Sequence, residues 1–201
     1  MKHHLPAETA YCRRRTDSGA FAIVWAAFKG QPKILRVILE EPLRVPRESA
    51  AILLNSKPGS CPEIDEIADQ IAAFLGGADI SFSLDRVLLE LCSDFQQQVL
   101  RAEHGIPRGW VSTYQLIAGF IGKPAAARAV GTALATNPFP LVIPCHRAVR
   151  SDRTLGGYQG GLAMKRALLA AEGIRFDNLG RVEVKEFFYS PGSCPQLPRR
   201  K

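Results

Sequence analysis

The chain has 201 residues, of which 46% are hydrophobic, and its formal net charge is +7. This length and composition allow one or two hydrophobic cores and exclude a disordered or low-complexity polypeptide. No apolar run is long enough to span a bilayer, and Met1–Ala10 lacks the apolar stretch of a signal peptide. We therefore expect no membrane association and a cytoplasmic protein, or a nuclear one if the source is eukaryotic.

The cysteines exclude a disulfide scaffold and a zinc ribbon, because they are odd in number, widely spaced and form no CxxC pair. They are Cys12, Cys61, Cys92, Cys145 and Cys194. Free thiols are typical of a reducing compartment. His3, His4 and Cys12 match no standard zinc spacing, so we expect no metal site.

Positive charge is concentrated in one part of the sequence. Residues 94–175 carry ten basic and four acidic side chains, whereas residues 1–93 carry eleven basic and twelve acidic ones. A local positive field favours a polyanionic partner such as DNA. A solvated basic surface explains the same counts, so charge alone does not decide between the two interpretations.

The first 91 residues read as a small unit of strands and helices. Residues 21–28 and 33–40 are apolar, strand-like runs separated by Lys29–Pro32, which predicts a hairpin. Apolar residues recur at helical spacing over Pro62–Leu75, and a glycine pair ends that run. Ile80–Leu89 is a further candidate strand. We find no chemical motif in this part of the chain.

A helix is predicted over Asp94–Gly105, followed by two short helices. Ser112 and Gln115 have the spacing of a capping box for the first short helix, which would run from residue 113 to 120. Pro124 suits the first turn of the next helix, which would end near residue 136. Two short helices joined by a tight turn in a basic segment match a helix-turn-helix, although plain helix packing gives the same pattern.

The second short helix presents one long cationic side chain. Val130 and Leu134 mark its apolar face, and Arg128 points roughly 160° away from Val130. The neighbours of Arg128 are small, namely Ala125, Ala126, Ala127 and Ala129. Such a helix can approach a nucleic acid closely, although a solvated surface arginine explains the same position.

A stiff, proline-rich approach leads to a candidate nucleophile. Pro138, Pro140 and Pro144 fix their backbone φ angles, and a strand-like Leu-Val-Ile run lies between the last two. Cys145 follows, with His146 and Arg147 beside it. A thiol attacks as its thiolate, which a nearby imidazole or cation favours. A Cys-His pair alone is a weak signal.

The ordered motifs of residues 94–175 resemble those of the O6-alkylguanine-DNA alkyltransferases, also called methylated-DNA–protein-cysteine methyltransferases. They are Ile106-Pro107-x-Gly109, Thr113-Tyr114, Ala127-Arg128-Ala129-Val130-Gly131, Asn137-Pro138, Pro144-Cys145-His146-Arg147, Gly156-x-Tyr158, Gly160-Gly161-Leu162 and a Lys165…Glu172-Gly173 helix. The resemblance implies a mixed α/β (α+β) fold. It comprises a small ribonuclease H-like N-terminal domain (1–91), a mostly helical domain with a helix-turn-helix (92–176) and a tail (177–201).

The resemblance also implies a function: DNA repair by direct reversal, in which one alkyl group moves from guanine O6, or from thymine O4, to the protein's own cysteine. Cys145 would accept the alkyl group. His146 would deprotonate the Cys145 thiol through a water, and Glu172 would orient His146. Nothing in the chain would convert the thioether product back to a free thiol, so one molecule would serve one lesion. No cofactor is implied.

Further roles follow from the same resemblance. Arg128 would replace an extruded nucleotide in the base stack, with Ala126 and Ala127 allowing close approach in the minor groove. Tyr114 would act on the rotating phosphate. Asn137 would support the active-site segment, and Tyr158, Gln159 and Lys165 would line the pocket. The implied partner is double-stranded DNA containing O6-alkylguanine, bound by a monomer.

Three positions depart from the pattern of the family, and they bear on pocket shape and on the size of the alkyl group accepted. They are Leu100, Ala148 and Gln159. Two other functions explain part of the pattern. A binding module would recognise alkylated bases without transferring anything, and would not need Cys145. A Cys-His-Glu hydrolase would turn over repeatedly, and would not need Arg128.

Overall fold

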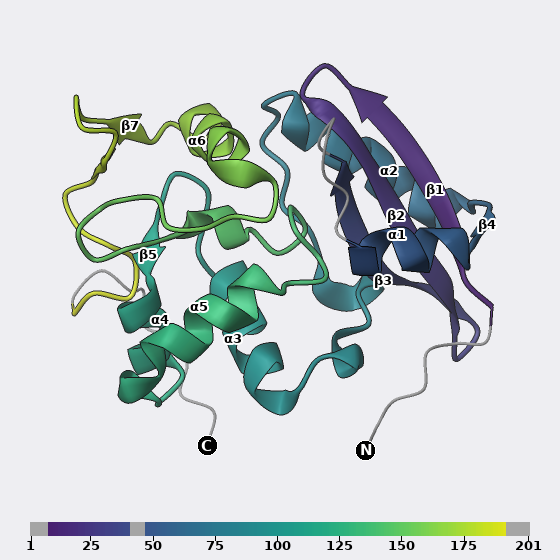
Figure 1. Ribbon diagram of the computed structural model, residues 1–201, viewed down its shortest axis with the longest axis horizontal. Helices are drawn as coiled ribbons and strands as arrows, with labels where there is room; N and C mark the ends of the chain where they lie inside the picture. Colours follow the sequence, from purple (N-terminus) through teal and green to yellow (C-terminus); the bar gives the residue numbers. More distant parts are fainter. Residues whose placement is uncertain (1–7, 41–46, 192–201) are drawn as a thin grey trace. The chain divides into compact units, whose positions relative to one another are not determined.

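Residues 8–40 and 47–191 are described by the computed structural model, in which helices and short strands are mixed (Figure 1). The chain divides into two compact units, residues 1–97 with 137–143 and residues 98–136 with 144–201. This division differs from the boundaries predicted at residues 91 and 176. Among the described residues, no helix is long and apolar enough to cross a membrane.

The first unit is built on a four-stranded sheet in the order β3-β2-β1-β4. Strands β1 (Ala10–Thr16), β2 (Gly19–Phe28) and β3 (Gln31–Glu40) are antiparallel, and β4 (Lys57–Pro58) pairs parallel with β1. Phe28 pairs with Gln31, so the turn has two residues, Lys29 and Gly30, with φ of 50° and 75°. The predicted hairpin is confirmed, and its primed turn suits the twist of the strands.

Two helices cover the two faces of this sheet (Figure 1). Helix α2 (Pro62–Leu75) has the predicted bounds, and its buried stripe is Ile64, Ile67, Ala68, Ile71 and Phe74. Helix α1 (Arg47–Leu54) packs Ile52 and Leu53 against the cluster formed by Ala22, Val24 and Ile38. Because side chains alternate along a strand, β2 contributes Phe21 and Ile23 to the opposite face.

The prediction of a strand over Ile80–Leu89 is wrong. That segment forms two 3₁₀ turns, η1 (Leu84–Arg86) and η2 (Leu89–Leu91). The Ser83 hydroxyl accepts a hydrogen bond from the N–H of Asp85, which starts the first turn. One isolated β-bridge, between Val87 and Ile34, and a hydrogen bond from the Lys33 ammonium to the Asp85 carbonyl connect the segment to β3. Side-chain capping therefore overrides the alternating apolar pattern.

The second unit begins within α3 (Asp94–His104), whose predicted bounds are confirmed to within one residue. Strand β5 (Ser112–Thr113) pairs with β6 (Ala148–Val149), and α4 (Tyr114–Phe120) follows β5 directly. The cap of α4 is Thr113, whose hydroxyl accepts from the N–H of Leu116, and not Ser112 as predicted. Ser112 is buried and donates instead to the carbonyl of Phe188.

A tight turn joins α4 to the next helix. Gly122 has φ of 73°, which favours glycine, and the N–H of Lys123 donates to the Ala118 carbonyl. The 3₁₀ turn η3 (Pro124–Ala126) leads into α5 (Ala127–Ala135). The Gln115 amide donates to the carbonyl of Pro124, so it braces this turn rather than completing a capping box.

The remaining elements include a hairpin that extends beyond the predicted domain end at residue 176. They are the 3₁₀ turn η4 (Cys145–Arg147), helix α6 (Gly161–Ala171) and a hairpin of β7 (Arg175–Phe176) and β8 (Val182–Glu183). Past the hairpin, the Tyr189 hydroxyl donates to the Ala102 carbonyl, and its ring stacks on Phe120 with centroids 4.0 Å apart. Residues 177–191 are therefore folded onto the second unit rather than forming a tail.

Residues 137–143, which precede Cys145, form a closed loop rather than the strand-like run predicted at Leu141–Ile143. The buried Asn137 side chain donates to the Ile143 carbonyl at 3.1 Å and accepts from the Phe139 N–H at 2.9 Å. Leu141 has φ of 72°, outside strand geometry. The Pro138 carbonyl accepts from the N–H of Val37, which attaches the loop to β3.

Asn137→Ala should destabilise the protein by roughly 2–6 kcal/mol, because two buried backbone groups lose their partner and each costs about 1–3 kcal/mol. Urea unfolding followed by circular dichroism measures the change. Asn55→Ala is the matched control, since that exposed amide also donates to a carbonyl, that of Ala51. Equal losses in the two variants would show that Asn137 does not close the loop.

Candidate functional site

The candidate nucleophile lies at the start of a tight turn. Cys145, His146 and Arg147 form the 3₁₀ turn η4, and the Arg147 N–H donates to the Pro144 carbonyl at 2.8 Å. All three side chains are buried, and Cys145 is 5% exposed. Neighbouring side chains in an extended segment point to opposite sides, so a turn is needed to bring the thiol and the imidazole into one site. The structure provides that turn.

A single carboxylate organises this turn. His146 Nε2 lies 2.9 Å from Glu172 Oε1, and both side chains are almost completely buried. Glu172 is the C-terminal cap residue of α6, 26 positions further along the chain. The structure therefore brings together two predicted site residues, Glu172 and His146. His146 directly follows Cys145 in the sequence.

Arg147 shares the same carboxylate, which sequence reasoning did not assign. Its Nε donates to Glu172 Oε2 at 2.9 Å and its Nη2 to Oε1 at 2.7 Å. The third donor, Nη1, binds the Ile106 carbonyl at 2.6 Å. Such two-point contacts fix the relative orientation of the two groups as well as their distance. The sequence offered two signals for this pair. One was the arginine of the Pro-Cys-His-Arg motif, and the other was the single acidic residue at the end of the later helix.

These contacts determine the charge states of the two groups. Burial raises the pKa of Glu172, but hydrogen bonds from His146 and Arg147 outweigh it and hold the pKa at about 2. Burial lowers the pKa of His146, and the bond to Glu172 only partly opposes this. At neutral pH Glu172 is therefore a carboxylate and His146 a neutral imidazole, the form that accepts a proton.

Lys165 joins the residue that follows the turn to the loop before α6. It is fully buried in α6, and its ammonium donates to the carbonyl of Ala148 at 2.6 Å and to that of Gly157 at 3.3 Å. The Tyr158 ring meets the His146 ring edge-on, with centroids 6.2 Å apart. Gln159, the third predicted pocket residue, is exposed in the loop before α6.

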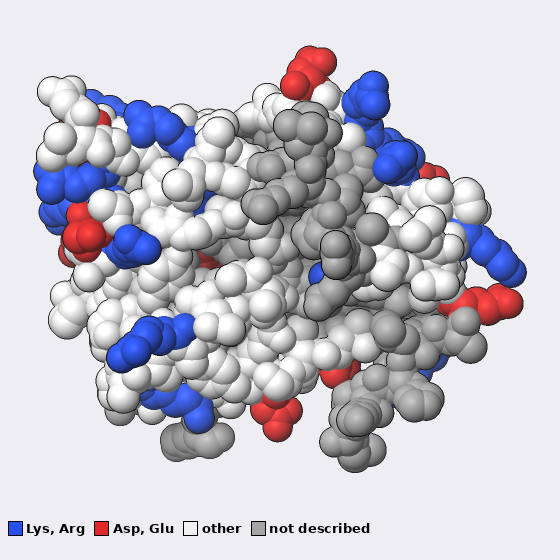
Figure 2. Space-filling view, viewed as in Figure 1, with Lys and Arg blue, Asp and Glu red and all other residues white. Residues whose placement is uncertain are grey.

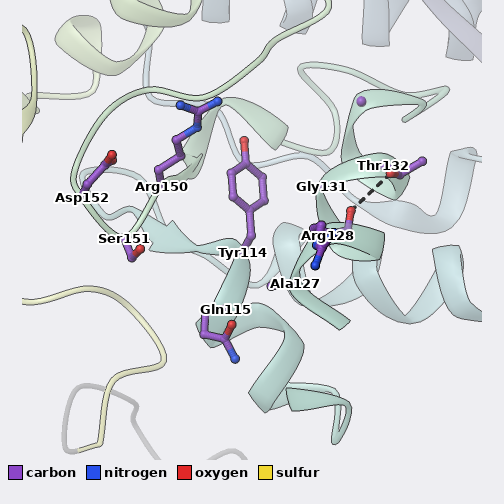
Figure 3. Close-up of a pocket in the computed structure, with 10 residues that line it drawn as sticks. Tyr114, Gln115, Ala127, Arg128, Gly131, Thr132, Arg150, Ser151 and Asp152 are labelled. Atoms are coloured by element: carbon purple, nitrogen blue, oxygen red, sulfur yellow. Dashed lines mark hydrogen bonds between the residues drawn. The ribbon is translucent and has the colours of Figure 1, made fainter. Parts of the chain in front are cut away.

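A hollow of about 540 Å³ lies between α4, α5 and the loop after β6 (Figure 3). Tyr114 stands in it with Arg128 on one side and Arg150 on the other. The other lining residues are Gln115, Ala127, Gly131, Thr132, Ala135, Ser151 and Asp152. Three predicted DNA-contacting residues, Tyr114, Ala127 and Arg128, are thus brought together, while Ala126 lies in η3 outside the lining.

The loop before α6 approaches Tyr114 so closely that only glycine suits one position. Gly156 has φ of 67°, and a Cβ atom added there would lie 2.6 Å from the Tyr114 hydroxyl. The predicted outward direction of Arg128 is confirmed, because Arg128 is exposed while Val130 and Leu134 are buried. Lys and Arg side chains form several groups on the face of the second unit shown in Figure 2.

No group of three potential metal ligands of the His, Cys, Asp or Glu type occurs within the described part of the chain. His3 and His4, which were weighed as zinc ligands, and Cys194 lie outside the described residues. Cys12, Cys61 and Cys92 are free thiols whose pKa values burial raises, that of Cys92 to about 11.

Comparisons with known proteins identify the family. Residues 94–174 match the model of the 6-O-methylguanine DNA methyltransferase DNA-binding domain. A methylated-DNA–protein-cysteine methyltransferase of Methanothermobacter thermautotrophicus is 42% identical over 114 residues, which are 57% of this chain and 64% of the relative. The bifunctional transcriptional activator and DNA repair enzyme Ada of Escherichia coli is 51% identical over 78 residues, 39% of this chain and 22% of Ada.

A solved structure covers more of the chain. The crystal structure of Mycobacterium tuberculosis OGT in complex with DNA matches with a TM-score of 0.66 and 31% identity, over 82% of this chain and 93% of that one. The structure of the Pyrococcus kodakaraensis O6-methylguanine-DNA methyltransferase, at 22% identity and a TM-score of 0.60, shows the same fold. The chain belongs to the methylated-DNA–protein-cysteine methyltransferase family.

Proposed function

We propose that this protein repairs alkylated DNA by moving one alkyl group from guanine O6 to the sulfur of Cys145. The observation that carries the proposal is a buried cysteine on a turn with His146, whose ring nitrogen lies 2.9 Å from Glu172. The sulfur attacks the alkyl carbon, a C–S bond forms and the C–O6 bond breaks. The electron pair of that bond stays on guanine, which takes up a proton.

His146 has a defined part in this sequence. The thiol proton passes to the neutral imidazole through a water, and the adjacent carboxylate stabilises the imidazolium that forms. Arg147 keeps Glu172 ionised and in place, so it acts as a positioning residue. The thioether product has no ready leaving group, so we expect a single turnover for each molecule.

DNA engagement is assigned to α4 and α5, which we propose form a helix-turn-helix. The target atom lies inside the duplex and is reached only after the nucleotide leaves the stack. Arg128, exposed on a helix of small residues, would fill the gap from the minor groove, with Ala126 and Ala127 permitting close approach. Tyr114, in the hollow beside Arg128, would act on the rotating phosphate.

The remaining assignments concern the pocket and the scaffold. Tyr158, Lys165 and Gln159 would line the pocket for the base, and Asn137 would hold the loop that leads to Cys145. The sheet order β3-β2-β1-β4, with β4 parallel to β1, supports the ribonuclease H-like assignment of the first unit. The partner would be double-stranded DNA with O6-alkylguanine, bound by a monomer. Activity on O4-alkylthymine and a cytoplasmic or nuclear location stay predictions.

The binding module and the hydrolase are distinguished from alkyl transfer by one measurement. After reaction with a duplex containing O6-methylguanine, the intact protein should gain the mass of one methyl group, on the peptide that carries Cys145. Multiple turnovers, or the label on Cys12, Cys61, Cys92 or Cys194, would contradict transfer to Cys145. Cys145→Ser is the control: it should gain no mass and still bind the duplex, more weakly as salt rises because phosphate contacts release counterions.

Arg128→Ala should slow repair of duplex DNA while sparing the reaction with free O6-benzylguanine, provided that Gln159 admits the larger group. The reason is that the free base needs no extrusion from a stack. Single-turnover rates on both substrates measure the difference. Arg15→Ala removes the same charge from an exposed position in the first unit and should change neither rate. Equal losses on both substrates for Arg128→Ala would exclude a part in extrusion.

His146→Ala and Glu172→Gln should each slow the alkylation of Cys145 by iodoacetamide near pH 7 by roughly ten-fold or more, since losing about 1.4 kcal/mol of thiolate stabilisation is a ten-fold effect. Peptide mass spectrometry resolves Cys145 from the other cysteines. His104→Ala and Glu183→Gln change the same residue types elsewhere, and circular dichroism checks folding. A rate unchanged in both site variants would remove the relay and leave positioning of the extruded base as the source of reactivity.

A further inference from the structure

One cation that lines the hollow between α4 and α5 has no part in the proposed mechanism. Arg150 is the first residue after β6, its side chain is exposed, and it lines the hollow together with Tyr114 and Arg128. Within residues 8–40 and 47–191, its guanidinium forms no hydrogen bond and no ion pair. Arg150 therefore presents a charge that a ligand entering the hollow can bind.

The short parallel sheet of the second unit places Arg150 beside Tyr114. Strands β5 and β6 are parallel, and Thr113 pairs with Val149. Tyr114 and Arg150 are the next residues along the chain, so they leave the same end of two strands that run about 5 Å apart. Figure 3 shows the Tyr114 hydroxyl and the Arg150 guanidinium on the same side of the hollow.

The backbone that carries Arg150 is held in a closed turn. The Arg150 N–H donates to the Thr154 carbonyl at 2.9 Å, and the Arg150 carbonyl accepts from the Arg153 N–H at 2.9 Å. The Arg153 carbonyl in turn accepts from the N–H of Val182 at 3.0 Å, which attaches the turn to β8. A backbone that is already ordered loses little conformational entropy when its side chain binds a ligand.

The other charges of the hollow favour an anion next to Tyr114. Arg128 lies on the opposite side of the Tyr114 ring from Arg150 (Figure 3). Burial raises the pKa of Tyr114 to about 12, although Arg150 opposes the shift, so the hydroxyl is neutral at pH 7 and can donate to an anion. The carboxylate of the hollow, Asp152, is engaged by its own turn: its Oδ1 accepts from the N–H and the hydroxyl of Thr154.

We propose that Arg150 binds the DNA phosphate next to the extruded nucleotide, the same phosphate on which Tyr114 would act. A guanidinium offers paired N–H donors that match two phosphate oxygens, and the Tyr114 hydroxyl supplies a further donor from the adjacent strand end. Arg128 and Arg150 then have different tasks, since one fills the base stack and the other holds the backbone. This inference rests on the proposed function, which supplies the extruded nucleotide.

The first test is the salt dependence of duplex binding, measured on Cys145→Ser so that transfer does not consume the lesion. Each phosphate neutralised by the protein contributes about 0.9 to the slope of log K against log salt concentration. Adding Arg150→Ala should make this slope shallower by about 0.9 and weaken binding several-fold at low salt. Arg150→Lys, which retains the charge, should restore the slope.

Arg175→Ala is the matched control, because Arg175 is an exposed arginine of the same unit that lies in β7, outside the lining of the hollow. It should leave the slope unchanged. An Arg150→Ala slope equal to that of the parent protein would overturn the proposal and leave Arg150 a solvated surface residue. A slope that Arg150→Lys does not restore would also overturn it, since the loss would then not come from charge.

The second test locates the phosphate. Three duplexes carry one neutral methylphosphonate each, on the 5′ side of the lesion, on its 3′ side, or several nucleotides away. One of the two adjacent positions should weaken binding of the parent protein but cause no further loss with Arg150→Ala, because the variant has already lost that contact. The distant position should weaken both proteins equally. Additive losses at both adjacent positions would contradict the assignment.

These outcomes are separable from those of the proposed function. Methyl transfer from the duplex to Cys145 combined with an unchanged Arg150→Ala slope would remove the phosphate contact and leave the repair reaction in place. A chain that binds no duplex at any salt concentration would refute both.

Discussion

The carboxylate of Glu172 is the group on which the site depends. It receives two hydrogen bonds from Arg147 and lies 2.9 Å from His146, so it joins the end of α6 to the turn that carries Cys145. Arg147 extends the connection to the Ile106 carbonyl after α3. Removing one member of a buried charged pair leaves the other uncompensated, which is far more costly than losing a surface pair. Geometry and charge are therefore maintained by the same contacts.

Burial limits the basicity of His146, and sharing one carboxylate with Arg147 adds to the effect. Arg147 already balances the charge of Glu172, and burial opposes a second cation nearby. The pKa of His146 therefore falls, which suits a base that holds a proton briefly and passes it on. A histidine paired with Glu172 alone would retain its proton more strongly. Arg147 touches no substrate in this scheme. It lowers the pKa of the proton acceptor, His146, through the Glu172 carboxylate that both side chains bind.

Local signals in the sequence predicted elements well where one pattern dominated. The apolar spacing of α2 and the Lys29-Gly30 turn both appear in the structure as predicted. Strand β1 escaped prediction because Arg13, Arg14 and Arg15 interrupt its apolar pattern, and only Cys12 is buried. The Ile80–Leu89 segment failed because a single hydroxyl, that of Ser83, stabilises a turn that hydrophobic alternation does not reveal.

The candidate site was likewise predictable only in part from the sequence. Cys145 and His146 were visible as neighbours, whereas the pairing of Arg147 with Glu172 joins residues 25 positions apart and depends on how α6 packs. Glu103, a buried residue of α3, was open to prediction in part. It follows Val99 by four residues, so helical spacing places it on the buried face of α3 with Ala102. What the sequence does not contain is the surroundings of its carboxyl group, which arise only once Ala148 and Lys165 are in place.

The buried ionisable groups of the second unit make the stability of the folded state depend on pH. Glu172, whose pKa is lowered, contributes stability above its unfolded pKa and loses it as pH falls towards about 2. Glu103, whose pKa is raised, costs stability as pH rises towards about 8. Burying the Lys165 ammonium costs stability below about pH 8, and this cost disappears as pH rises from there towards the ordinary lysine pKa of 10.5. An apolar residue at position 165 would remove that cost. The same ammonium donates to the carbonyls of Ala148 and Gly157, so the group that weakens the folded state near neutral pH also holds the residue after the η4 turn to the loop before α6.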